Sequence, residues 1–207
     1  MSKFPLTTYG TASAYGAEYF HTLAKAAQRI DLKQVDKAAS ILLNAVNAGN
    51  RIYSCGNGGS AAIADHLCCD VLKGVRTGTD LKPDVTSLVS TVSLITAISN
   101  DIGYDAVFRY QLESIAKAGD VLITISSSGN SPNIVHAVEW AKANGVSTIA
   151  LTGFEGGQSA RLADVSIHVP AENYGVVEDI HQSIMHMLAQ YLRQAHMDPK
   201  AVPATKF

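Results

Sequence analysis

The chain has 207 residues, of which 47% are hydrophobic, 7% aromatic and only 16% charged, and its formal net charge is −2. This hydrophobic share excludes a disordered chain, and the charge balance argues against a nucleic-acid-binding protein. Charged residues normally make up about 25% of a soluble domain. Either Ser, Thr and Asn supply most of the polar surface, or part of the surface is buried against another chain.

The cysteines and the apolar runs indicate the cellular compartment in which the protein is expected. Cys55, Cys68 and Cys69 form an odd, clustered set, which does not indicate a disulfide framework and favours a reducing compartment. The N-terminus has no apolar run of signal-peptide length. No stretch approaches the roughly 20 apolar residues of a membrane-spanning helix. We therefore expect a cytoplasmic protein with no membrane partner.

The first part of the chain predicts an arm followed by two helices. Pro5 and Gly10 favour an irregular arm over residues 1–10. From 12 to 43, apolar residues recur at spacings of three and four, as in amphipathic helices. Asp31 is suited to cap the second of them.

From residue 51 onward, predicted strands alternate with helices. Nearly continuous apolar strands are predicted at 51–55, 85–88, 121–125, 146–153 and 165–169. Helices are predicted over 60–73, 91–99, 105–118, 132–144, 156–162 and 175–196. This alternation predicts a parallel sheet covered on both faces. The expected fold is α/β, a flavodoxin-like, doubly wound five-stranded parallel sheet with N-terminal helices, in one domain over 1–207.

The first of two unusual strand-to-helix turns reads GNGGS at 56–60. It lacks the Lys of a P-loop and the spacing of a dinucleotide fingerprint. Its glycines let a ligand approach the backbone closely, and Ser60 stands at the expected N-cap. In a doubly wound sheet, ligands bind beyond the carboxyl ends of the strands, where this turn is expected to lie.

The second unusual turn reads SSSGNSP at 126–132. Ser131 is a favourable N-cap and Pro132 a favourable first helical residue. Four hydroxyls and free backbone N–H groups would then converge on a helix N-terminus, where the helix dipole favours an anion. An ordinary polar capping loop is the alternative. The number of serines around one helix start favours a phosphate site, built from neutral donors because neither turn contains Lys or Arg.

The pairing of CGNGGS at 55–60 with ISSSGNS at 125–131 resembles the sugar isomerase (SIS) family, as do AISNDIGYDAVF and IALTGFEGG. Within that family the chain is most similar to the phosphoheptose isomerases. The resemblance implies interconversion of sedoheptulose 7-phosphate and D-glycero-D-manno-heptopyranose 7-phosphate. It also implies a homotetramer, for which 11–48 would be the oligomerisation segment. The implied phosphosugar-binding residues are Asn57, Gly58, Gly59, Ser60, Asp101, Ser126, Ser127, Ser128, Ser131 and Glu178.

Four ionisable residues on two helices are the catalytic candidates. Isomerisation through an enediol needs a base near the C–H group and an acid near the carbonyl oxygen. His66 and Asp70 are four residues apart on one predicted helix, and Glu178 and His186 are eight apart on another, so each pair shares a helix face. The resemblance implies that Asp70 and His186 are the acid–base pair. It also implies that all four can ligate one zinc ion, which suits two imidazoles and two carboxylates.

The chain departs from the family pattern at the sugar end of the expected site. Asp70 stands where the family has Glu, which is longer by about 1.5 Å, one bond, and Glu178 stands where it has Gln. A family aspartate before Glu178 has no counterpart in NYGVV at 173–177. Two alternatives therefore stay open. One is an isomerase of a related phosphosugar, and the other is a non-catalytic scaffold resembling the DnaA-initiator-associating protein.

Overall fold

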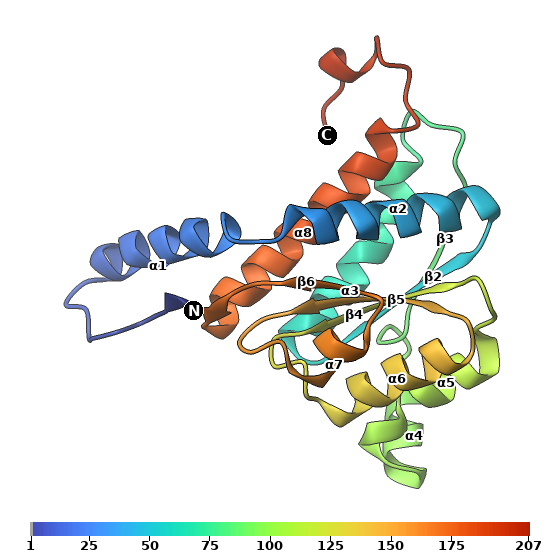
Figure 1. Cartoon of the computed structure of the whole chain (residues 1–207), viewed down its shortest axis with the longest axis horizontal. Coiled ribbons are helices and arrows are strands. Elements are labelled where there is room, and N and C mark those ends of the chain that lie inside the picture. Colours follow the sequence, from blue (N-terminus) through green and yellow to red (C-terminus); the bar gives the residue numbers. More distant parts are fainter. Residues whose placement is uncertain (1) are drawn as a thin grey trace.

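A central sheet of five strands organises the computed structural model, which describes residues 2–207 (Figure 1). The strands are β2 (Arg51–Gly56), β3 (Asp84–Ser87), β4 (Val121–Ser126), β5 (Ser147–Thr152) and β6 (Val165–His168). Their order is β3-β2-β4-β5-β6, and every neighbouring pair is parallel. This confirms the predicted flavodoxin-like topology. The strand order reverses between β2 and β4, which is where a doubly wound sheet forms its binding crevice.

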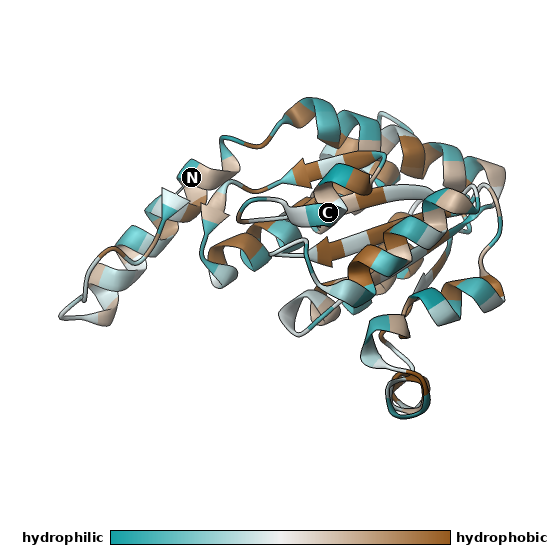
Figure 2. Cartoon of the chain, turned by 60° about the horizontal axis from the view of Figure 1, so that its bottom comes forward, coloured by the Kyte–Doolittle hydropathy of each residue, from teal (hydrophilic) through white to brown (hydrophobic). Residues whose placement is uncertain are grey.

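The strands are apolar on both faces because both faces are covered. Successive side chains of a strand point to opposite faces, and in β2 Ile52 and Tyr53 belong to two separate hydrophobic clusters. Both side chains are almost completely buried. Figure 2 shows the hydrophobic stretches of the strands enclosed between helices of mixed character.

The helices form one layer on each face of the sheet (Figure 1). The first hydrophobic cluster includes residues of α2 (Leu32–Ala48), α3 (Gly59–Cys69) and α8 (Tyr174–Gln194). The second includes residues of α4 (Val92–Asp101), α5 (Arg109–Ile115) and α6 (Pro132–Ala143). The short α7 (Gly157–Leu162) contacts β5, β6 and α6. Within residues 2–207, none of the helices combines the length and hydropathy needed to cross a membrane.

The N-terminal arm is more ordered than the sequence predicts. Strand β1 (Ser2–Lys3) pairs in parallel with β7 (Ala171–Glu172), just before α8. Phe4 follows at 5% exposure, and its ring contacts the rings of Tyr9, Tyr15 and Tyr19. The prediction of an irregular arm over 1–10 was wrong at these first residues because it overlooked this aromatic cluster. Helix α1 (Ala12–Ala27) then extends away from the sheet (Figure 1).

Two predicted helices are each divided into two pieces. The helix expected over 60–73 is α-helical only to Cys69 and continues as the π-helical segment η1 (Asp70–Val75). The helix expected over 105–118 is a 3₁₀ turn, η2 (Tyr104–Ala106), followed by α5. A π turn takes one more residue than an α turn and is common at functional sites. The spacing of apolar residues in a sequence does not distinguish π-helical or 3₁₀ segments from an α-helix.

Candidate active site

The two polar turns meet at the carboxyl ends of β2 and β4 and enclose a small pocket. Its volume is about 120 Å³. The pocket is lined by Asn57, Ser60, Ile125, Ser126, Ser127, Ser128, Ser131, Tyr174 and Glu178. Seven of these nine were candidate ligand residues from sequence. The structure therefore brings the two turns together at the switch in strand order, although they are about 70 residues apart in the chain.

The first turn depends on glycine for its close packing. A Cβ atom at Gly56 would lie 2.5 Å from the Ser60 carbonyl oxygen, so a larger residue would displace the start of α3. Gly58 has a φ of 57° and is the N-cap of α3. The expectation that Ser60 caps this helix is therefore wrong. Ser60 lies in the first turn at 3% exposure, and its hydroxyl belongs to the wall of the pocket.

The four serines of the second turn differ in the hydrogen bonds that their hydroxyls make. Ser126 Oγ accepts from the Gly129 N–H at 3.2 Å, and Ser128 Oγ accepts from the Asn130 N–H at 3.3 Å. Ser127 Oγ is buried and has no hydrogen-bond partner among residues 2–207. Ser131 is the N-cap of α6 by position, but its side chain makes no capping hydrogen bond. A buried hydroxyl without a partner is costly, so the pocket presents hydroxyls that a bound anion would satisfy.

Asn57 is fixed by neighbours that the sequence did not single out. Its side-chain Nδ2 donates to Asn133 Oδ1 at 3.0 Å, and Asn133 Nδ2 donates back to Asn57 Oδ1 at 2.9 Å. The Tyr104 hydroxyl also donates to Asn57 Oδ1, at 2.9 Å. Asn133 is 1% exposed. These contacts orient the Asn57 amide at the edge of the pocket.

A second group of candidates meets where α3 continues into η1. His66, Asp70 and His186 each offer one ligand atom, and these atoms lie within 4.8 Å of one another. Asp70 Oδ2 is 2.8 Å from His186 Nδ1, and Asp70 Oδ1 is 3.2 Å from His66 Nε2. The two imidazole rings pack edge to face with centroids 4.9 Å apart. Asp70, the first residue of η1, thus contacts both histidines.

The contacts of His186 define its neutral tautomer. Its Nδ1 faces the Asp70 carboxylate, which can only accept from it when ionised. Its Nε2 lies 3.0 Å from Gln182 Nε2, an amide donor. Neutral His186 therefore carries its proton on Nδ1 and presents Nε2 as an acceptor. Sequence reasoning missed Gln182, although its position four residues before His186 on the same helix could have indicated it.

Glu178 lies at the serine pocket, away from the two histidines. It is two helical turns from His186, about 12 Å along α8 at 1.5 Å per residue. A Cβ atom at Gly59 would collide with its carboxylate, which covers the first turn of α3. Burial raises the pKa of Glu178, and the nearby charge of Asp179 raises it further. The structure thus does not bring Glu178 together with the other three residues expected to ligate a metal.

Asp101 is also outside the serine pocket as the chain forms it. It is the last residue of α4, and its Oδ1 accepts from Asn100 Nδ2 at 2.7 Å. Its contact with a sugar stays a prediction.

Replacing Glu178 with Gln is expected to strengthen the binding of sulfate to the serine pocket at pH 7. A carboxylate in the pocket repels an anion, and Gln keeps the size of the side chain while removing its charge. The expected gain in affinity is about fivefold to tenfold, on the scale of one partly screened charge pair. Calorimetric titration measures it, and Glu18→Gln, the same substitution at an exposed glutamate on α1 outside the pocket lining, is the control. Equal affinities for wild type and Glu178→Gln would contradict the prediction.

Comparison with known proteins identifies the family. Residues 17–153 match the SIS domain family, and the chain belongs to that family. The curated relatives that it matches include phosphoheptose isomerases from several bacteria. That of Colwellia psychrerythraea is 40% identical over 161 residues, covering 76% of this chain and 82% of the relative. That of Vibrio cholerae is 39% identical over 165 residues, covering 79% and 85%.

Solved structures agree with this assignment. The phosphoheptose isomerase of Neisseria gonorrhoeae superposes with a TM-score of 0.79 and 33% identity, over 87% of this chain and 95% of the other. That of Francisella tularensis gives a TM-score of 0.83 at 28% identity, over 89% and 99%. The similarity thus includes nearly the whole length of these enzymes.

Proposed function

We propose that this chain is a phosphoheptose isomerase that interconverts sedoheptulose 7-phosphate and D-glycero-D-manno-heptopyranose 7-phosphate. The observation that carries the proposal is the pairing of a serine-lined pocket with a His–Asp–His cluster in one SIS fold. The pocket supplies neutral hydroxyl and N–H donors for a phosphate. The cluster supplies the ionisable groups that aldose–ketose exchange needs.

The two parts of the site lie at opposite ends of α3. Ser60 is in its first turn, and Asp70 directly follows its last residue. Ten residues correspond to about 15 Å along the helix axis. This arrangement suits an elongated phosphosugar whose reacting carbons are several bonds from its phosphate.

Asp70 and His186 are the acid–base pair of the proposed mechanism. With the phosphate held by the serine turn, one of them takes the proton from the carbon beside the carbonyl. The other supplies a proton to the carbonyl oxygen, which gives the enediol. Return of a proton to the former carbonyl carbon, with loss of the hydroxyl proton from the oxygen of its neighbour, forms the aldehyde and completes the isomerisation. The 2.8 Å contact between Asp70 Oδ2 and His186 Nδ1 keeps the imidazole oriented during both transfers.

The donor set of the cluster fits a zinc ion. His66, Asp70 and His186 would hold it, since two imidazoles and one carboxylate with an open position are typical of catalytic zinc. When bound, zinc would polarise the substrate carbonyl. Treatment with a chelator is expected to remove one zinc per chain and to lower activity, and added zinc to restore both. His66→Ala should lower the zinc content measured by atomic emission, whereas His21→Ala should leave it unchanged.

The direct test of the function is turnover of a panel of phosphosugars. Purified enzyme, with and without added zinc, is expected to convert sedoheptulose 7-phosphate to the aldose faster than it converts five- or six-carbon ketose phosphates. Product is followed by NMR. Absence of product from sedoheptulose 7-phosphate under both conditions would refute the proposal. Faster turnover of another phosphosugar would refute the seven-carbon assignment but keep the reaction class.

We further propose a cytoplasmic homotetramer that uses the helical segment 11–48. Helix α1 buries only Thr22 and Ala26, and it exposes Phe20 at 68%. A second copy that covers such a surface would also account for the low share of charged residues in the sequence. Light scattering coupled to size-exclusion chromatography measures the mass. We expect four chains for wild type and a smaller species for Phe20→Glu.

A further inference from the structure

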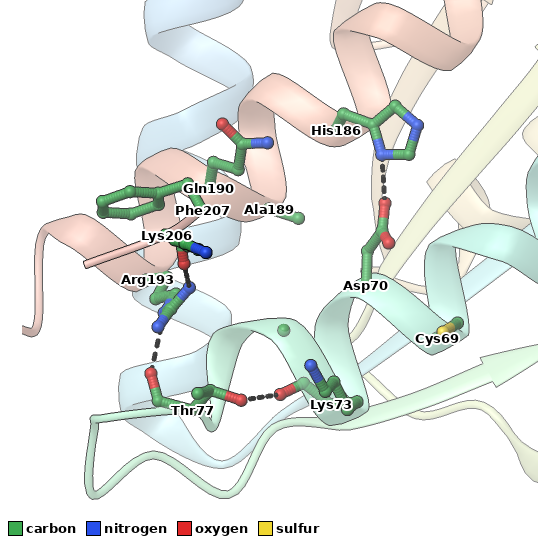
Figure 3. Close-up of a pocket in the computed structure, with 11 residues that line it drawn as sticks. Cys69, Asp70, Lys73, Thr77, His186, Ala189, Gln190, Arg193, Lys206 and Phe207 are labelled. Carbon is green, nitrogen blue, oxygen red and sulfur yellow. Dashed lines mark hydrogen bonds and ion pairs between the residues drawn. The ribbon is translucent and has the colours of Figure 1, made fainter.

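A larger cavity, lined in part by Asp70 and His186, shares no lining residue with the serine pocket (Figure 3). Its volume is about 440 Å³, within the range of small-molecule sites. Its walls come from η1, from the second half of α8 and from the last two residues of the chain. Lys206 and Phe207 line it together with Lys73, which is about 130 residues earlier in the chain. Neither the serine turn nor Glu178 contributes to it.

The cavity is lined by three cations and one carboxylate. Lys73, Arg193 and Lys206 are the cations, and none of them has an acidic partner within 4.0 Å among residues 2–207. The carboxylate is Asp70, which already contacts two histidines. Figure 3 shows the Lys73 amine directed into the open space between η1 and α8. The charged side chains that line the cavity thus sum to a net positive charge.

The positive charge of Arg193 is buried and held in place by hydrogen bonds. This residue is only 9% exposed, and its Nε donates to the Thr77 carbonyl at 2.7 Å. Its Nη1 donates to the Lys206 carbonyl at 3.1 Å, and its guanidinium lies 4.9 Å from the centre of the Phe207 ring. Carbonyls and a ring orient the guanidinium but do not neutralise it. A buried cation without a counter-ion is unfavourable, so an anion in the cavity would lower the electrostatic free energy.

We propose that this cavity is a second anion site, which binds the phosphate group of a small phosphorylated metabolite. Lys73 and Lys206 contact the phosphate from opposite sides, and Arg193 holds the chain end that carries Lys206. Lysine amines bind phosphate as point charges, and the space left over accommodates the organic part of the ligand. The site is distinct from the serine pocket, and its binding does not depend on turnover.

Calorimetric titration with inorganic phosphate tests the proposal on the full chain. Wild type is expected to bind two phosphates per chain. Lys73→Ala/Lys206→Ala should weaken one of them about tenfold or more, the scale of lost charge-assisted hydrogen bonds. Ser127→Ala/Ser131→Ala should weaken only the other. Lys33→Ala/Lys37→Ala on α2 removes the same charge elsewhere and is the matched control. Both cavity lysines are exposed, so their replacement leaves the core intact.

Hydrogen exchange of the C-terminal segment gives a second readout. Phosphate is expected to slow the amide exchange of residues 198–207 in wild type and in the serine variant, but not in Lys73→Ala/Lys206→Ala. One phosphate per chain, lost in the serine variant, would overturn the proposal. So would equal binding by the cavity variant and the α2 control. If the site binds phosphate but the chain shows no isomerase activity, the proposed function fails and this one stands.

Discussion

Replacing His186 with Asn is expected to lower kcat for the isomerisation by about 10²-fold to 10⁴-fold, the usual contribution of a general acid–base group. Asn preserves a polar side chain that still hydrogen-bonds to Asp70, but it does not exchange a proton near neutral pH. KM for the sugar phosphate should change little because the phosphate is bound at the serine turn. Steady-state kinetics on sedoheptulose 7-phosphate separates the two constants.

The control for this change is His136→Asn, which alters a half-buried histidine on α6 that belongs to neither the serine pocket nor the His–Asp–His cluster. It should leave kcat unchanged. The double change of His186→Asn and Asp70→Asn should cost about as much as the more damaging single change, because the two side chains act as one pair. A His186→Asn enzyme with wild-type kcat, or strictly multiplicative losses in the double variant, would contradict the assignment of this pair.

The free energy of unfolding is expected to fall by up to about 3 kcal/mol between pH 6.5 and pH 4 because of His181. This side chain is fully buried on α8, and neither ring nitrogen has a hydrogen-bond partner among residues 2–207. Burial, with a smaller contribution from the nearby His168, lowers the pKa of His181 from 6.5 to about 4. The unfolded chain thus binds a proton at this position below about pH 6.5, whereas the folded chain stays neutral until about pH 4.

The sign of the effect follows from this difference in proton uptake. The stability is fully present above pH 6.5, is lost as the pH falls through the window, and changes no further below the folded pKa of about 4. Urea unfolding at pH 7.5, 6 and 5 measures it. His181→Leu should remove this component because it leaves nothing to protonate, and His21→Leu should retain it. Parallel pH profiles for wild type and His181→Leu would contradict the prediction.

The sheet and the serine pocket could be predicted because their signals are local. Strands buried on both faces, such as Val121–Ser126, are apolar almost throughout, so they stand out in the sequence. The carboxyl ends of parallel strands meet at one edge, so the turns after β2 and β4 had to be close. The pocket lined by Ser60 and Ser127 follows from these two facts.

The spacing of residues in the sequence could not predict that Glu178 lies apart from the His–Asp–His cluster. Glu178 and His186 share a face of α8, but a shared face does not say that two side chains meet when they are two turns apart. Gln182, between them, contacts His186 instead. The contact of Tyr104 with Asn57 was also hidden, because it joins segments that only the tertiary fold places side by side.

Helix α8 is fastened at both ends by the chain termini. Its N-cap, Asn173, donates from Nδ2 to the Phe4 carbonyl at 3.0 Å, and Arg193 in its last turn donates to the Lys206 carbonyl at 3.1 Å. Phe4 and Lys206 belong neither to the lining of the serine pocket nor to the His–Asp–His cluster. Sequence drift in these terminal segments can therefore shift the axial position of His186 relative to Asp70. Substitutions in the terminal segments thus change the geometry of the acid–base pair while every residue of the site stays the same.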